Sequence, residues 1–135
     1  MSLKINQYDI WLADLSPKMG TESGKTRPVV VVQTNLLNHI DHPSTLIVPC
    51  TTHLLKHSAV LRIRIQASSD QSDRDIRQSV PGLHPSKSGL EKDSELMMDQ
   101  LRSIDNRRLI QKLGTLPSAQ IEQVKESLEV VLDLT

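Results

Sequence analysis

Two segments of the chain show a regular pattern of hydrophobic and polar positions. Between residues 61 and 65, aliphatic side chains alternate strictly with Arg62 and Arg64. This period of two predicts a half-buried strand with a basic outer face, which suits phosphate contact and ordinary solvation equally well. From Ile121 to Val131, apolar residues recur at helical spacing, which predicts an amphipathic helix packed on the sheet or on a partner subunit. Ser118 is expected as its N-cap.

Four further segments are rich in β-branched and aliphatic residues and are predicted as strands. They span residues 8–15, 29–33, 45–50 and 95–101. The apolar run Val29–Val32 is typical of a strand buried on both faces, and we expect this strand to begin at or just after Pro28, because proline lacks a backbone N–H. Asp9 falls outside the apolar face of the first strand and is expected to be solvated. Short helical turns are expected at 35–41 and after Asp105, which can cap the second one.

The composition narrows the class of protein. A chain of 135 residues fits one domain, and we interpret residues 1–135 as a single domain with a polar loop insertion at about 67–88. The formal net charge is zero, and there is one Tyr, one Trp and no Phe. A global basic field and aromatic base stacking are therefore both poorly supported. Any RNA contact would depend on Arg, Lys and polar groups.

Cysteine usage and the missing targeting segments indicate the cellular compartment. Its single cysteine, Cys50, suits a reducing environment and is expected in the core. No apolar run is long enough to span a membrane and no signal-peptide hydrophobic region is present, so we expect a soluble, cytoplasmic protein. Paired-cysteine zinc spacing, an HExxH motif and a glycine-rich phosphate loop are also missing. We expect no metal and no cofactor.

A candidate site precedes the valine run. Gly20–Lys25 is small and polar and carries Glu22, which predicts a loop, and Arg27 follows at the rim of the buried strand. Loops on a rigid scaffold are frequent functional sites, but a surface loop with a solvated arginine fits the same spacing. Thr51 and Thr52 come just past the third apolar run, where they either lie exposed at the strand's exit or pack on its pleated surface.

Several blocks of the chain, in this order, match a known pattern. They are Tyr8–Pro17, Gly20, Glu22, Gly24–Val32, Val48–Thr52, Lys92–Ser94 and Asp99–Asp105. Together they resemble the MazF/PemK family, the toxin endoribonucleases of bacterial type II toxin–antitoxin pairs, over nearly the whole chain except residues 67–88. The resemblance implies a mainly β (α+β) fold, a small SH3-like β-barrel with short helices and a C-terminal amphipathic helix, assembled as a twofold homodimer.

The same resemblance implies an activity and partners. The protein would cleave single-stranded RNA at a short sequence without a metal, through attack of the 2′-OH, and leave a 2′,3′-cyclic phosphate and a 5′-OH. A cognate antitoxin would silence it by covering the groove, and the pair would bind DNA as a complex. The outcome in the cell would be inhibition of translation and growth.

The resemblance also assigns roles to residues. The implied catalytic residues are Arg27, Thr52 and Glu22, and the candidate RNA-binding residues are Thr21, Lys25, Gln100 and Arg102, with His53 added because it follows Thr52 directly. A guanidinium suits phosphate binding and stays protonated in proteins, which makes Glu22 the more ordinary general base. Family accounts nevertheless assign proton transfer to the matching arginine. The sequence leaves the identities of the base and the acid open.

Two other classes of function compete with this interpretation. The first is a non-enzymatic toxin of the same fold that inhibits DNA gyrase, but such proteins act through an exposed aromatic residue in the C-terminal tail, and residues 130–135 contain none. The second is a catalytically silent barrel that binds only an antitoxin or DNA. The presence of Glu22, Arg27 and Thr52 together argues against it.

Overall fold

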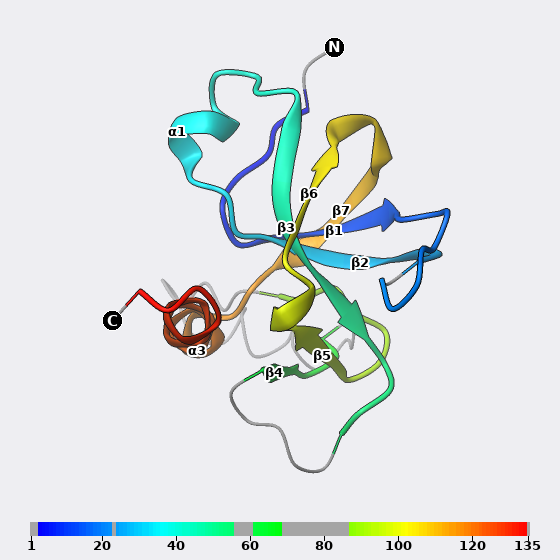
Figure 1. Ribbon diagram of the computed structural model, residues 1–135, viewed down its shortest axis with the longest axis vertical. Coiled ribbons are helices and arrows are strands. Elements are labelled where there is room, and N and C mark those ends of the chain that lie inside the picture. Colours follow the sequence, from blue (N-terminus) through cyan, green and yellow to red (C-terminus); the bar gives the residue numbers. More distant parts are fainter. Residues whose placement is uncertain (1–2, 23, 56–60, 69–86, 135) are drawn as a thin grey trace, which may run out of the picture.

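The computed structural model describes residues 3–22, 24–55, 61–68 and 87–134, and its seven strands join in one bent sheet (Figure 1). In chain order the elements are β1 (Asp9–Asp14), β2 (Thr26–Val31), α1 (Asn35–Asn38), β3 (Ser44–Thr51), β4 (Arg62–Ile65), β5 (Ser94–Met97), the 3-10 turn η1 (Met98–Gln100), β6 (Arg102–Asp105), the 3-10 turn η2 (Asn106–Arg108), β7 (Leu109–Thr115) and α3 (Ser118–Val131). The spatial order is β4-β5-β3-β2-β1-β7, and β6 pairs with β3 beside this path.

The long strand β3 links the two parts of the sheet. Its first half pairs with β6, its middle at Ile47–Pro49 pairs with β2, and its end at Cys50 and Thr51 pairs with β5. All six strand pairings within the described residues are antiparallel. The predicted mainly β fold with short helices and a C-terminal helix is confirmed. The described strand path runs from β4 to β7, and no pairing between these two strands closes it.

The valine run separates two hydrophobic cores, as its uninterrupted apolar pattern predicts. Val30 packs in one cluster, and Val29 and Val31 pack in the other, on the opposite face of the sheet. Helix α3 covers the first cluster: Val124 is fully buried there, and Ile121, Leu128 and Val131 pack around it. Each fully buried aliphatic side chain contributes about 1.5–3 kcal/mol. These two cores fix the scaffold on which the candidate site rests.

Strand β2 begins at Thr26, earlier than the predicted start at or after Pro28. The register explains the difference. Pro28 pairs with Leu12 of β1, whereas the pairing with β3 begins only at Val29. Because β2 has a neighbour on one side alone at this point, it tolerates a proline as an edge strand does. Arg27 is therefore part of the strand.

The segment predicted as one strand at 95–101 is divided in the structure. Strand β5 ends at Met97, the chain turns through η1, and the separate strand β6 begins at Arg102. Both strands pair with β3, at opposite ends of it. A second correction concerns α3, whose N-cap is Pro117 with no side-chain hydrogen bond, while Ser118 is its first helical residue. The predicted cap at Asp105 is confirmed: Asp105 is the N-cap of η2, and its carboxylate accepts a hydrogen bond from the backbone N–H of Arg107 in that turn.

Asp9 is buried, and the prediction that it is solvated was wrong. Its carboxylate accepts hydrogen bonds from the Asn6 N–H at 2.8 Å and the Trp11 indole at 3.3 Å. Lys112 of β7 completes the set with an ion pair of 3.2 Å. Buried charges persist when they are paired and hydrogen-bonded, and this one joins β1 to β7.

The predicted insertion at 67–88 lies mostly outside the described residues, which resume at residue 87. The two described ends of that stretch are held together. The Ser88 hydroxyl donates to the Gln66 carbonyl at 2.9 Å, and the Ser88 N–H donates to the Ser68 hydroxyl at 2.7 Å. Across the described part of the chain, no helix is long and apolar enough to cross a membrane.

Candidate functional site

Arg27 lies where β2 and β3 separate. The β2–β3 pairing stops at Val29 and Pro49, and β3 then turns to pair with β5 from Cys50. The Arg27 side chain fills the gap: its Nη1 donates to the Cys50 carbonyl at 3.3 Å and its Nε to the Gly24 carbonyl at 2.9 Å. These bonds hold the guanidinium at the rim, and within the described residues they leave its other N–H groups available to a ligand.

The loop before β2 is anchored at its base. The Lys25 carbonyl accepts from the Leu15 N–H at 2.9 Å, and the Glu22 N–H donates to the Met19 carbonyl at 3.0 Å. A Cβ at Gly24 would lie 2.5 Å from the Cβ of Lys18, so only glycine lets the two arms of the loop approach this closely. The predicted loop at residues 20–25 is thus confirmed for its described residues, as a structured feature.

The loop is joined to the segment that follows β5. The Gln100 amide donates to the Thr21 carbonyl at 3.0 Å, and Glu22 forms an ion pair with Arg102 at 3.3 Å. These four residues, with Asp99 and Leu101, line an open hollow of about 420 Å³. Four of the eight residues singled out from the sequence therefore meet in one place.

Thr52 follows the end of β3 and is exposed. It lines a second hollow, of about 490 Å³, together with Pro28 next to Arg27. Thr51 differs from Thr52 in that its hydroxyl accepts a hydrogen bond from the His53 N–H at 3.1 Å. Thr52 thus lies at the strand's exit, one of the two alternatives that the sequence left open.

Two candidate residues stand apart from this arrangement. Lys25 and His53 are exposed, and neither side chain forms a hydrogen bond or ion pair with the other candidates in the described part of the chain. Asp99 was not singled out from the sequence although it lines the same hollow as Glu22. Its position directly before Gln100 was the available signal.

Cys50 lies beside Arg27 but is a core residue, as expected. Burial raises the pKa of its thiol to about 12, and the nearby Arg27 charge lowers it only in part. A thiol that stays protonated is a poor nucleophile. Within the described residues no group of three His, Cys, Asp or Glu side chains is arranged to hold a metal ion.

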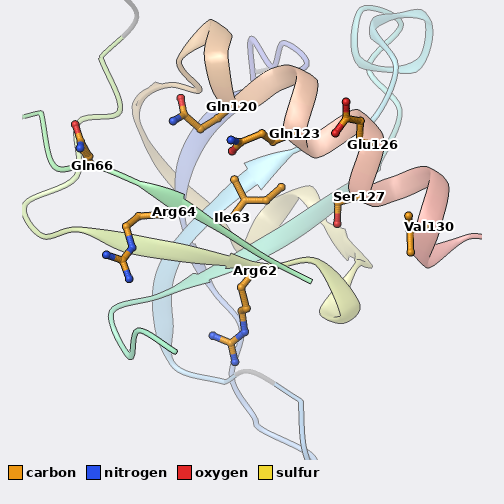
Figure 2. Close-up of a pocket in the computed structure, with 9 residues that line it drawn as sticks. All are labelled: Arg62, Ile63, Arg64, Gln66, Gln120, Gln123, Glu126, Ser127 and Val130. Atoms are coloured by element: carbon orange, nitrogen blue, oxygen red, sulfur yellow. The ribbon is translucent and has the colours of Figure 1, made fainter. Parts of the chain in front are cut away.

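A larger hollow, of about 680 Å³, lies elsewhere, between β4 and α3 (Figure 2). The alternation predicted for 61–65 is confirmed for β4, with Ile63 and Ile65 buried and Arg64 exposed. Arg62 and Arg64 each lie 3.9 Å from a carboxylate oxygen of Glu95. The basic face of β4 is therefore partly neutralised by a buried acid.

The chain was compared with known proteins. The family described as PemK-like, MazF-like toxin of type II toxin-antitoxin system matches residues 6–132. The sequence is 28% identical to Endoribonuclease EndoA of Bacillus subtilis (strain 168) over 130 residues, with 96% of each chain covered. It is 29% identical to Endoribonuclease MazF of Staphylococcus epidermidis, covering 96% of this chain and 92% of that one.

Solved structures share the fold. MazF (Form-I) from Deinococcus radiodurans superposes with a TM-score of 0.70 at 16% identity, covering 98% of this chain and 99% of that one. MazE-MazF (Form-II) from the same organism gives a TM-score of 0.65 at 16% identity and covers 99% of this chain and 100% of that one. An endoribonuclease in complex with its cognate antitoxin, from a Mycobacterial species, also gives 0.65, at 14% identity with 97% of both chains covered.

Proposed function

The chain belongs to the family of PemK-like, MazF-like toxins of type II toxin–antitoxin systems. We propose that it is the toxin of such a pair and that it is an endoribonuclease, which cuts single-stranded RNA at a short sequence. Relatives that span nearly its whole length are named endoribonucleases. The observation that carries the proposal is the contact between the Glu22 loop and the segment after β5, which gathers Thr21, Glu22, Gln100 and Arg102.

The proposed reaction is transfer of a phosphodiester within the RNA itself. The ribose 2′-OH attacks the adjacent phosphorus, its proton passes to a base, the P–O5′ bond breaks, and the departing 5′ oxygen takes up a proton. The products are a 2′,3′-cyclic phosphate and a 5′-OH. Glu22, with a half-exposed carboxylate held by Arg102, is positioned to act as the base.

Arg27 supplies the charge that this reaction requires. Negative charge grows on the phosphate oxygens as the 2′ oxygen adds, and a fixed guanidinium stabilises it without reorganisation. The two main-chain carbonyls that accept from Arg27 hold it in position beforehand. Thr52 is exposed at the exit of β3, and its hydroxyl can donate a hydrogen bond to another phosphate oxygen. Gln100 and Arg102 contact the adjoining nucleotides.

We also propose a cognate antitoxin and a twofold homodimer as the assemblies of this toxin. One similar solved structure is an endoribonuclease in complex with its cognate antitoxin, and another is MazE-MazF. Leu54 and Leu55, directly after Thr52 and His53, are exposed apolar residues that a second subunit would cover. Light scattering on the purified protein tests the dimer: a monomer at micromolar concentration contradicts it.

The activity is tested on a long RNA of mixed sequence in EDTA, with read-out of cut positions and end groups. We expect cuts at a recurring short motif with cyclic-phosphate ends. Arg27→Ala should lower the rate by about 100-fold or more, the scale seen when one charge-stabilising donor is removed. Arg107→Ala is the matched control, because Arg107 is highly exposed and bonds only to Asp105 in the described part of the chain. Intact RNA, or an Arg27→Ala variant that folds and cuts at the wild-type rate, would overturn the proposal.

A further inference from the structure

The hollow between β4 and α3 follows the edge of a strand. It is lined by the successive β4 residues Arg62, Ile63 and Arg64 and, from α3, by residues that include Gln123 and Val130. Side chains of a strand point alternately to opposite faces, and Figure 2 shows Ile63 pointing toward α3 and both arginines on the other side of the strand. A hollow that touches residues of both faces must lie beside the main chain itself.

Along that edge, the backbone groups of alternate residues have no strand partner within the described residues. The ladder pairs Ile63 with Leu96 and Arg64 with Glu95, and the Met98 N–H donates to the Leu61 carbonyl in the same register. Hydrogen-bonded pairs alternate along an antiparallel ladder, so Ile63 and Ile65 exchange bonds with β5. The N–H and C=O groups of Arg62 and Arg64 point the other way, and within the described residues no strand pairs with them.

The Arg62 and Arg64 side chains beside this edge are only partly neutralised by Glu95, so they can bind a further anion. Glu95 is buried and lies 3.9 Å from each guanidinium, longer than the usual 2.7–2.9 Å or so of a charge-assisted hydrogen bond. One carboxylate thus faces two cations on the arginine side of β4, while Glu126 lines the hollow from α3, so the excess of positive charge lies on the arginine side alone. The Arg64 side chain is half exposed, so its guanidinium is accessible to a partner.

We propose that the groove between β4 and α3 is a strand-addition site for an extended acidic segment of a partner protein. Two acidic residues, two positions apart, would face Arg62 and Arg64, and the residue between them would face α3. A second copy of this chain fits poorly, because an antiparallel pair of β4 edges would place arginine against arginine. An added strand gains affinity from main-chain bonds and specificity from alternate side chains.

The hollow between β4 and α3 shares no lining residue with the hollows beside Thr52 and Glu22, although Arg64 pairs with Glu95 and Glu95 pairs with Thr51 of β3. If the occupant belongs to the antitoxin, which depends on the proposed function, the antitoxin would hold the toxin at a second point. Tethering at two points raises overall affinity through effective concentration.

The test uses the whole protein, labelled with ¹⁵N, and the peptide Ac-Thr-Glu-Val-Glu-Thr-amide as the probe. We expect saturable shifts of the Arg62 and Arg64 amide signals and slower hydrogen exchange at both, because both N–H groups gain acceptors. Two control peptides separate the contributions. The lysine counterpart reverses the charge, and the version N-methylated on both glutamates keeps the charge but cannot donate hydrogen bonds from those residues.

Equal binding of the lysine peptide would overturn the acidic preference, and equal binding of the N-methylated peptide would overturn strand addition. Shifts confined to residues outside β4 and α3 would overturn the location. Arg64→Gln should weaken the glutamate peptide about fivefold to tenfold, and unchanged affinity in this folded variant would also count against the proposal. The RNA assay is independent, so failure of the endoribonuclease proposal and failure of this site are distinguishable.

Discussion

Glu22 and Arg102 form an ion pair of 3.3 Å between the loop that precedes β2 and the first residue of β6. The hydrogen bond from Gln100 to the Thr21 carbonyl lies beside it. Both side chains of the ion pair are partly exposed, and such pairs contribute only about 0.2–1 kcal/mol to folding. The consequence of this contact is positional, since it fixes the Glu22 carboxylate relative to the rim that carries Arg27.

The first prediction distinguishes the effect of the ion pair on the position of the Glu22 carboxylate from its effect on the stability of the fold. Arg102→Ala should leave the melting temperature almost unchanged but lower the rate of RNA cleavage about tenfold, because a misplaced base costs much of the orientation that the site provides. Cleavage rates and thermal melts of this variant are compared with those of Arg107→Ala, which removes a more exposed arginine (91% of the side chain against 27% for Arg102) from another surface ion pair. Wild-type cleavage by Arg102→Ala would show that the ion pair does not position the base.

The second prediction concerns Glu95, whose side chain is only 6% exposed and lies between two arginines. It also accepts the Leu55 N–H at 2.7 Å. Glu95→Ala leaves the largely buried Arg62 guanidinium without a counter-charge, and breaking a buried pair on one side costs about 3 kcal/mol. Urea unfolding should therefore give a free energy of unfolding lower by that amount. Glu122→Ala, which removes an exposed acid paired with Lys125, should change it by less than about 0.5 kcal/mol.

How much the sequence predicts depends on whether a signal is local. The valine run and the 61–65 alternation indicate burial directly. The first prediction holds, and the second holds for Ile63 and Ile65, whereas Leu61 is exposed and precedes β4. The end of β5 at Met97, the turn η1 and the start of β6 at Arg102 depend on how the two strands pair with β3, which apolar content does not reveal. Asp9 was misjudged for the same reason, since its partner Lys112 comes from β7.

The candidate site follows the same rule. Spacing places Arg27 at a strand rim and Glu22 in a loop, and the structure agrees. The contacts of that loop with Gln100 and Arg102 are long-range, so only the family resemblance brought these residues to attention together. The β4–α3 groove had no counterpart in the sequence at all, because an edge exists only once the strand order is known.

The third prediction tests a close crossing of backbones. A Cβ at Gly114 in β7 would lie 2.0 Å from the Lys87 carbonyl oxygen and 2.6 Å from the Ser88 carbonyl carbon. Main-chain atoms cannot yield as a flexible side chain can, so Gly114→Ala should lower the free energy of unfolding by about 3 kcal/mol or more. Gly20→Ala is the comparison: it has space for a Cβ but a φ of +57°, and should cost only about 1–2 kcal/mol. Equal melting temperatures for the two variants would contradict the crossing.

The fourth prediction follows from the buried thiol of Cys50, because burial raises its pKa from the usual 9.0 to about 12. At pH 8 the native protein should not react with a thiol reagent such as DTNB, and it should react fully in urea, with Cys50→Ala as the blank.

The raised pKa of the Cys50 thiol also sets the sign of the pH effect on stability. The folded state keeps the proton that the unfolded chain loses above pH 9, so the contribution is complete below pH 9 and declines as pH rises toward 12. Between pH 9 and 10 the unfolding free energy of wild type should therefore fall more steeply than that of Cys50→Ala. Parallel slopes, or rapid labelling of the native protein at pH 8, would show that the thiol is accessible and Cys50 is not a core residue.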